Sequence, residues 1–318
     1  MNSVLIRLPN WIGDFIMSLG LVRCLREKFP DTHIAAYSRK TIATLASLEP
    51  MFDEVITIND RGLRGKFHTM RKLRSMKYDL HIVLPPSFSS ALIAGGIAAP
   101  SLGFRGQNRS FLLSESVKRP ADLHRAMEYI ALVNKMLDIP LPYTDSIVFC
   151  PNRVPDISHF ELPDDYIVFN PFAVAESRRL TPAKAARIIE KLGSDRTVLI
   201  GTPFQKALCD QIGTGINLSG MTSLPELVGI LKSAKTVLTV DSGPAHLANA
   251  LERPVVDISG PDDPAGTRPY NSQFLHLIRR DLNCSPCVKN RCRYGTNAWI
   301  EDIQASELIE AVLSNISE

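Results

Sequence analysis

Short runs of apolar, largely β-branched residues alternate with amphipathic stretches along the first half of the chain. Residues 4–8, 33–37, 55–58 and 80–84 are predicted strands, and residues 123–137 are a predicted long helix. This alternation predicts a mostly parallel sheet with helices on both faces. The most apolar window, residues 90–99, falls well short of the roughly 20 residues that a membrane span needs, so it predicts a buried helix.

The same alternation starts again in the second half. Predicted strands over residues 166–169, 198–200, 237–240 and 255–258 are separated by helices that begin near Pro182, Ser223 and Pro244. Between the halves, residues 138–163 are rich in proline and weakly periodic, as expected of a linker. The sequence therefore predicts an α/β protein with two Rossmann-like doubly wound domains, residues 1–150 and 151–318. Ligands of such sheets bind outside the carboxyl ends of the strands, which predicts an interdomain cleft with a site on each wall.

Composition narrows the choice of partners and compartment. The net charge is +3 over 318 residues, which excludes a protein that coats a polyanion but permits a local basic surface. The N-terminus lacks the pattern of a secretion signal, and six scattered or clustered cysteines fit a reducing compartment. We therefore expect a cytoplasmic protein.

The first predicted strand leads into the stretch NWIGDFIMSLG, at the place where a nucleotide-binding protein often has a glycine-rich phosphate loop. This turn has Gly13 followed by Asp14 and no G-x-G-x-x-G pattern, which argues against a dinucleotide-dependent oxidoreductase. Asp14 has two interpretations: a residue that complements the helix dipole, or a general base in the cleft. The helix terminus would lower its pKa and burial would raise it.

A second helix start follows the predicted strand 237–240, in the stretch Asp241, Ser242, Gly243, Pro244. Asp241 and Ser242 are possible caps, and Pro244 suits the first turn. Free N–H groups and the helix dipole make such a start an anion site, with His246 one turn further on. The alternative is an ordinary capped helix. Arg178, with its neighbour Arg179, is either a phosphate ligand or solvated surface.

A basic stretch separates two of the predicted strands of the first half. Residues 61–77 include Arg61 and Arg64 among seven Lys and Arg residues, and contain no acid. This stretch has three interpretations: a solvated helix face, a binding surface for an acidic acceptor, or a surface that lies against an anionic membrane. No aromatic interleaving or reader motif accompanies it, so no nucleic acid is expected. Arg105 and Arg109 could extend the same basic surface.

Three cysteines cluster near the C-terminus. Cys284, Cys287 and Cys292 include the C-x-x-C spacing of a metal knuckle, but a structural tetrahedral site needs four ligands and no fourth Cys or His follows nearby. Metal ligands and reduced structural thiols are equally compatible with this pattern.

Taken together, these motifs resemble glycosyltransferase family 9, the ADP-heptose:lipopolysaccharide heptosyltransferases, and most closely the heptosyltransferase II type. The resemblance covers essentially the whole chain and is carried by residues 10–14, 84–92, 103–105, 109–113 and 241–248. It implies a GT-B fold, with an acceptor-binding N-terminal domain and a donor-binding C-terminal domain. It also implies inversion at the anomeric carbon, with no cofactor, because the protein's own positive groups would replace a metal at the diphosphate.

The resemblance implies roles for individual residues. Asp14 would be the general base. Arg178, Asp241, Ser242, Gly243 and His246 would bind ADP-heptose, and Arg61, Arg64, Arg105 and Arg109 would meet the anionic lipopolysaccharide core at the inner face of the cytoplasmic membrane. Gln205 stands where relatives often have an acid that contacts the nucleoside, and Ala298 to Ile300 stand where some relatives have a fourth cysteine. The alternatives are a transferase that uses another nucleotide sugar or a protein acceptor, and a non-catalytic protein that binds a nucleotide or a lipid.

Overall fold

The computed structural model describes residues 1–138, 140–287 and 289–317. The chain forms two compact units, Met1–Arg153 and Val154–Glu318. The predicted boundary between residues 150 and 151 lies beside this division. Ile139 of the predicted linker and Val288 of the cysteine cluster lie outside the described residues.

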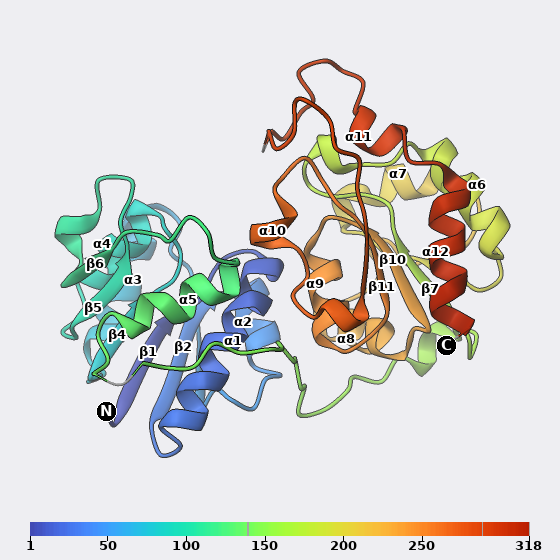
Figure 1. The fold of residues 1–318 in the computed structure, drawn as a ribbon. Helices are drawn as coiled ribbons and strands as arrows, with labels where there is room; N and C mark the ends of the chain where they lie inside the picture. The colour runs from blue at the N-terminus through green and yellow to red at the C-terminus, as the bar shows by residue number, and fades with distance from the viewer. Residues whose placement is uncertain (139, 288, 318) are drawn as a thin grey trace. The chain divides into compact units, whose positions relative to one another are not determined.

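The first unit is built on a six-stranded, fully parallel sheet with strand order β3-β2-β1-β4-β5-β6 (Figure 1). The four predicted strands are confirmed; the apolar residues of β1, β2 and β4 are buried on both faces, whereas Thr57 of the edge strand β3 is exposed. The sequence does not predict β5 and β6, which are short; β6 is an edge strand and β5 lies beside it. The strands are β1 Ser3–Arg7, β2 His33–Arg39, β3 Glu54–Ile58, β4 Leu80–Val83, β5 Ser101–Phe104 and β6 Glu115–Val117.

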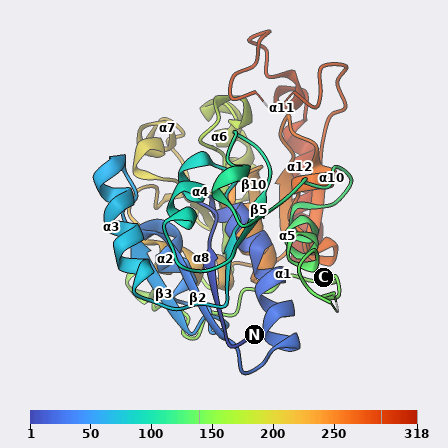
Figure 2. The ribbon, with the colours of Figure 1, turned by 90° about the vertical axis from the view of Figure 1, so that its left-hand side faces the viewer.

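Among the described residues of this unit, five α-helices connect and cover the strands. α1 packs against α5, and α3 lies beside α4 (Figure 2). Leu73 of α3 and Ile93 of α4 share a core cluster with Leu5, Ala35 and Tyr37 of the sheet, so α3 and α4 cover the same face. The helix predicted over residues 123–137 is shorter, and the predicted buried helix ends at Gly95. The helices are α1 Ile12–Lys28, α2 Lys40–Ala46, α3 Gly62–Arg74, α4 Phe88–Gly95 and α5 Arg125–Asn134, with the 3-10 turn η1 Ser110–Leu112.

The second unit repeats the architecture. Its parallel sheet has the order β12-β11-β10-β7-β8-β9, which is the order of the first sheet when strands are counted from β7. The four predicted strands are confirmed, whereas β9 and β12 are additional. The strands are β7 Ile167–Asn170, β8 Thr197–Leu199, β9 Ile216–Asn217, β10 Thr236–Val240, β11 Val255–Ile258 and β12 Leu275–Ile278.

The helices of this unit begin near the residues that the sequence predicts. Ser223 caps α8: its hydroxyl accepts from the backbone N–H of Glu226 at 3.3 Å, and the Glu226 carboxylate accepts from the N–H of Ser223 at 2.7 Å. α12 packs on α6 and closes the core. The helices are α6 Pro182–Leu192, α7 Lys206–Asp210, α8 Leu224–Ser233, α9 Gly243–Ala250, α10 Pro264–Thr267, α11 Ala298–Glu301 and α12 Ala305–Ser317, with 3-10 turns η2 Ser158–Phe160, η3 Glu176–Arg178, η4 Pro203–Gln205 and η5 Ser272–Phe274.

Each sheet has one point at which the order of connection reverses. It lies between β1 and β4 in the first unit and between β7 and β10 in the second. Ligands of open α/β sheets bind at the carboxyl ends of the strands beside such a reversal. The loops that follow these four strands are therefore the places to look for function. Within the described residues, no helix is both long and apolar enough to span a membrane.

Candidate active site

Asp14 lies at the reversal point of the first sheet. It is the third residue of α1, which follows β1 after a four-residue loop. Trp11 occupies the N-cap position without a side-chain cap, and its ring is exposed. The Asp14 carboxyl keeps 28% of its surface exposed, so it is accessible although most of it is covered. The chain thus presents a carboxylate where it could hydrogen-bond to a ligand.

Asp14 lies at a helix N-terminus, which favours the charged carboxylate, and it is largely buried, which favours the neutral carboxyl. Burial is the larger influence and raises the pKa of the carboxyl above its ordinary value, while Arg125 and Arg119 lower it. The nearer guanidinium, Nη1 of Arg125, lies 3.8 Å from Oδ1 of Asp14. A general base is most effective when its pKa approaches the working pH, so the upward shift favours that role.

Arg125 belongs to an ion-pair cluster that the sequence analysis does not identify. Its Nε lies 2.9 Å from Oε2 of Glu128, one turn along α5, and Nη1 of Arg119 lies 3.2 Å from the same oxygen. Glu128 is buried, and burial raises its pKa. The guanidinium of Arg119 also lies over the ring of Phe104, 4.7 Å from its centroid. The i, i+3 spacing of Arg125 and Glu128 could have indicated their pairing, but nothing local indicates Arg119.

A buried arginine holds the loop that leads into α1. Arg7, the last residue of β1, donates from Nη1 to the Leu8 carbonyl at 3.1 Å and from Nη2 to Oδ1 of Asn10 at 3.0 Å. The same Nη2 lies 3.2 Å from Asp60, which follows β3 and is also buried. Because both charges are desolvated and paired, the loop between β1 and α1 is tied to the neighbouring strands.

The predicted acceptor arginines follow other strands of the same sheet. Arg61 is the N-cap residue of α3 and Arg64 lies in its first turn; both are exposed. Arg105 directly follows β5, is exposed, and donates from Nε to the carbonyl of Ser116 at 3.0 Å. The structure therefore gathers these three cations at the carboxyl edge of the first sheet.

Arg109 differs from the other three, because it is completely buried. Its Nε donates to the Phe104 carbonyl at 2.9 Å, and its Nη1 donates to the carbonyls of Pro85 and Ser87. Burial lowers the pKa of its guanidinium to about 10. Arg109 is thus not part of an exposed basic surface: the expectation that it extends the surface of Arg105 is wrong in this respect, because the carbonyls of Phe104, Pro85 and Ser87 hold its guanidinium in the interior.

In the second unit the reversal point is bridged by side chains. Asn170, the last residue of β7, donates from Nδ2 to Oγ of Ser242 at 2.8 Å and to Oγ1 of Thr239 at 3.1 Å. Ser242 is the N-cap residue of α9, but its hydroxyl makes no cap hydrogen bond. The expected capping by Ser242 is therefore absent. Because Gly243 opens the helix without a side-chain cap, the start of α9 is better suited to receive an anion.

Arg178 lies between two carboxylates beside this helix start. Its Nη1 is 3.3 Å from Oδ2 of Asp241, and its Nη2 pairs with Asp262. Burial raises the pKa of Asp241, whereas the charge of Arg178 lowers it. Asp257 is buried behind them, and burial together with the charge of Asp241 holds its pKa well above the ordinary value. A Cβ on Gly260 would lie 2.6 Å from Oδ2 of Asp241, so glycine permits this close arrangement.

The other predicted donor residues are largely enclosed. Gln205 is buried; its Oε1 accepts from the backbone N–H of Thr202 at 2.8 Å, and its Nε2 donates to the Phe172 carbonyl at 2.9 Å. His246 is the fourth residue of α9 and is also buried. Contacts of Gln205 and His246 with a nucleotide stay predictions.

The clustered cysteines are partly exposed free thiols. Cys284, Cys287 and Cys292 are not in disulfides. Hydrogen bonds from backbone N–H groups, chiefly that of Asn297, lower the pKa of the Cys292 thiol. Among residues 1–138, 140–287 and 289–317, no group of three or more His, Cys, Asp or Glu is arranged to hold a metal ion.

Comparison with known proteins agrees with the fold. The profile of glycosyltransferase family 9 (heptosyltransferase) matches residues 67–298. Lipopolysaccharide heptosyltransferase 2 of Escherichia coli K12 is 29% identical over 97% of both chains, and that of Salmonella typhimurium is 28% identical over 99% of both. The structure of E. coli ADP-heptose lps heptosyltransferase II superposes with a TM-score of 0.81 at 26% identity, covering 100% of this chain and 99% of that one.

These matches confirm the expected GT-B fold, with its two parallel six-stranded sheets. The family match covers more than half of the chain and includes the start of α9 and the three clustered cysteines. The chain therefore belongs to glycosyltransferase family 9, the heptosyltransferases, and is a glycosyltransferase.

Proposed function

We propose that this glycosyltransferase moves heptose from ADP-heptose onto the inner core of lipopolysaccharide, with inversion at the anomeric carbon. The observation that carries the proposal is the partly exposed carboxyl of Asp14, with a raised pKa, at the reversal point of the first sheet. The choice of substrates is supported by the names of the relatives that align over nearly the whole chain.

Asp14 acts as the general base. Its carboxylate accepts the proton of an acceptor hydroxyl while the hydroxyl oxygen attacks the anomeric carbon. The new glycosidic C–O bond forms as the bond from that carbon to the diphosphate oxygen breaks, and ADP leaves with the electron pair. General-base catalysis of this kind typically contributes about 10²–10⁴ to the rate. Arg125 beside Asp14 favours the ionised form of the carboxyl, which is the form that accepts a proton.

The second unit binds the donor. The uncapped start of α9, from Ser242 through Gly243, directs backbone N–H groups and the positive end of the helix at the diphosphate. Arg178 exchanges part of its pairing with Asp241 and Asp262 for phosphate oxygens, so the charge that builds on ADP is stabilised as it leaves. His246 of α9 and Gln205 of η4, which follows β8 in the same sheet, complete the proposed nucleotide site.

The first unit binds the acceptor. Arg61, Arg64 and Arg105 are exposed at the carboxyl edge of the sheet that carries Asp14, and guanidinium groups suit the phosphates of an anionic core. Arg109 contributes by shaping the loop after β5. Transfer takes place at the inner face of the cytoplasmic membrane, with the protein bound peripherally.

The test uses purified protein, ADP-heptose and two truncated lipopolysaccharides as acceptors, one without core heptose and one with a single core heptose. Wild type should release ADP and add heptose to one of them, as measured by mass spectrometry. Asp14→Asn should lose about 10²–10⁴ in turnover and still be stabilised thermally by ADP, because the donor site is intact. Asp31→Asn, which changes an exposed aspartate of the same unit, is the matched control. Full turnover in Asp14→Asn would contradict the base role, and equal stabilisation by ADP and UDP would contradict the donor.

A further inference from the structure

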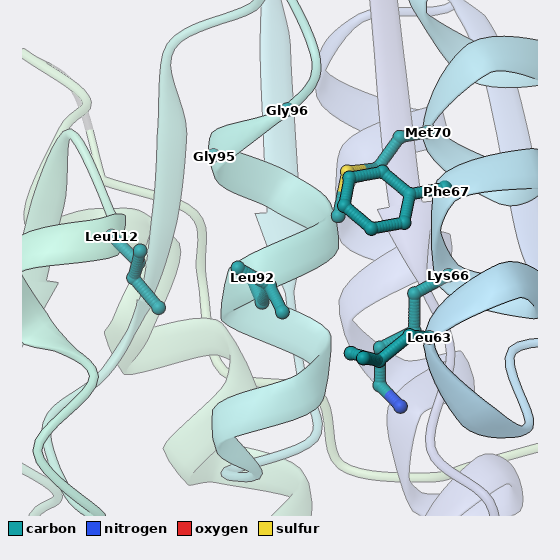
Figure 3. A pocket seen from close by; sticks show the side chains of 8 residues that line it. All are labelled: Leu63, Lys66, Phe67, Met70, Leu92, Gly95, Gly96 and Leu112. Carbon is teal, nitrogen blue, oxygen red and sulfur yellow. The ribbon is translucent and has the colours of Figure 1, made fainter.

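Helices α3 and α4 form an apolar groove that the catalytic residues do not use. Its cavity has a volume of about 250 Å³. In Figure 3, Phe67 and Met70 of α3 extend toward α4, while Leu92 of α4 and Leu112 of η1 line the other side. The groove residues are Leu63, Lys66, Phe67, Met70, Leu92, Gly95, Gly96 and Leu112.

Two large apolar side chains at the groove are left in solvent. Leu63 is 69% exposed and Phe67 is 65% exposed. They are four residues apart on α3 and therefore lie on one face of the helix. In contrast, Leu73 on the inner side of the same helix is fully buried in the core. One face of α3 thus holds the helix on the sheet, and another presents apolar groups outward.

Glycines keep the groove open at its base. A Cβ on Gly96 would lie 2.6 Å from Sδ of Met70, and one on Gly95 would lie 3.2 Å from the carbonyl oxygen of Leu112. Side chains at these positions would push Met70 outward or separate α4 from η1. The cavity therefore depends on the end of α4 being free of side chains.

Positive charge surrounds the apolar groups. The stretch from Arg61 to Lys77 has seven Lys and Arg residues and no acid. Across the part of the chain that the structure describes, none of the seven lies within 4.0 Å of a carboxylate. Arg71 and Lys72, in the last turns of α3, are exposed. Unpaired cations beside exposed Leu and Phe are the combination that interfacial helices use on anionic lipid surfaces.

We propose that this α3–α4 face is the surface through which the enzyme docks on an anionic bilayer. Leu63 and Phe67 enter the boundary between headgroups and acyl chains, and the cations from Arg71 to Lys77 contact anionic headgroups. The inference rests on the proposed function in one respect, because a lipid-linked acceptor requires the enzyme to reach a membrane. It goes further by naming the docking surface and assigning the apolar groove to lipid.

The experiment measures co-sedimentation of the full chain with vesicles. Wild type should bind vesicles of equal parts phosphatidylglycerol and phosphatidylcholine and should not bind phosphatidylcholine alone. L63S/F67S should weaken binding by about tenfold or more, because two apolar side chains no longer leave water. R71E/K72E should weaken it similarly and should abolish most of its dependence on salt.

Matched controls separate docking from general effects. Tyr143→Ser removes another exposed aromatic side chain of the same unit, and R187E/K191E reverses two exposed charges on α6 of the other unit. Both should bind vesicles as wild type does. Circular dichroism and thermal unfolding confirm that each variant folds.

Several outcomes would overturn the inference: wild-type binding by L63S/F67S, equal binding to neutral vesicles, or a wild-type dimer that L63S/F67S converts to a monomer without loss of vesicle binding. Measurement of heptose transfer distinguishes an incorrect docking surface from an incorrect proposed function. If both hold, L63S/F67S should transfer heptose normally to a water-soluble acceptor and poorly to an acceptor in vesicles. If the enzyme transfers no heptose, vesicle binding still tests the docking surface by itself.

Discussion

Nη1 of Arg125 lies 3.8 Å from Oδ1 of Asp14, and the same guanidinium pairs through Nε with the buried Glu128. The carboxyl that we propose as the base is therefore held between two opposing influences. Burial raises its pKa, and Arg125 limits the rise. Since Glu128 fixes Arg125 from the other side, the distance to Asp14 is set by α5 and not by a freely moving side chain.

Removal of this cation should change the pH dependence of turnover. In Arg125→Met the pKa of Asp14 rises further, because only the more distant Arg119 still favours the charged form. The acidic limb of the kcat/KM profile should move to higher pH, with the largest loss of rate at low pH and a smaller loss on the alkaline side. Lys135→Met, which removes an exposed cation at the C-cap of the same helix, should leave the profile in place. A uniform loss at all pH values would mean that Arg125 acts by binding acceptor instead.

Asp14 should also lower the stability of the fold at neutral pH. Its folded-state pKa is raised, so between the ordinary aspartate pKa, about 3.9, and the raised value the folded protein holds a proton that the unfolded chain has lost. The free energy of unfolding therefore falls as pH rises through this window, and the cost is fully present above it. Asp14→Asn should unfold at a higher temperature than wild type at neutral pH and at the same temperature near pH 3, as measured by calorimetry. A lower unfolding temperature for the variant at neutral pH would contradict a net cost of ionisation.

Gly260 offers a test of the donor site that leaves its charged groups in place. A methyl group at this position would lie 2.6 Å from Oδ2 of Asp241 and 3.2 Å from Nε of Arg178, so Gly260→Ala should displace both side chains. The displacement of Arg178, which we propose as a ligand of the diphosphate, should weaken ADP binding by about tenfold, the equivalent of about 1.4 kcal/mol. Gly266→Ala is the matched control, because a Cβ there meets nothing within 4 Å. Isothermal titration with ADP should separate the two variants, and equal affinities would place the donor away from Asp241.

The elements that the sequence predicts well are those whose own residues determine them. The strand runs beginning near Val4 and Val237 are mostly apolar, as is typical of strands buried on both faces, and Ser223 and Glu226 form the capping box that their spacing indicates. β6 is missed because it has three residues at a sheet edge and no apolar run. Such a strand forms only because β5 supplies its hydrogen-bonding partner.

The site residues were predicted less completely, because their environment comes from distant parts of the chain. The position of Asp14 at a strand-to-helix turn is local, but its partner Arg125 is on α5. A loop arginine such as Arg109 has the sequence signature of a solvated cation, and only folding reveals the carbonyls that bury it. Likewise Ser242 has the composition of a cap, and Asn170 of β7 engages its hydroxyl instead. Sequence patterns thus identify the residues, and the tertiary contacts decide what they do.

Glu49 is hydrogen-bonded to the backbone near the end of the first unit. It is buried behind α2, and its Oε2 accepts from the backbone N–H of Cys150 at 3.1 Å. Burial raises its pKa to about 7, although hydrogen bonds from the backbone of Cys150 and Met51 oppose the shift. Glu49 therefore exchanges its proton in the pH range where the enzyme is expected to work.

The sign of its effect follows from proton binding. Between pH 4.5 and about 7 the folded protein keeps a proton on Glu49 that the unfolded chain has released, so the free energy of unfolding decreases as pH rises, by about 3 kcal/mol at most. Glu49→Gln removes this dependence and retains an oxygen that can accept from Cys150. Denaturant unfolding should show the variant gaining stability relative to wild type from pH 5 to pH 8, and a difference that does not change with pH would exclude Glu49 as the titrating group. The N–H of Cys150 donates more strongly to the carboxylate than to the neutral acid, so this hydrogen bond persists on ionisation and the cost comes from the burial of the charge.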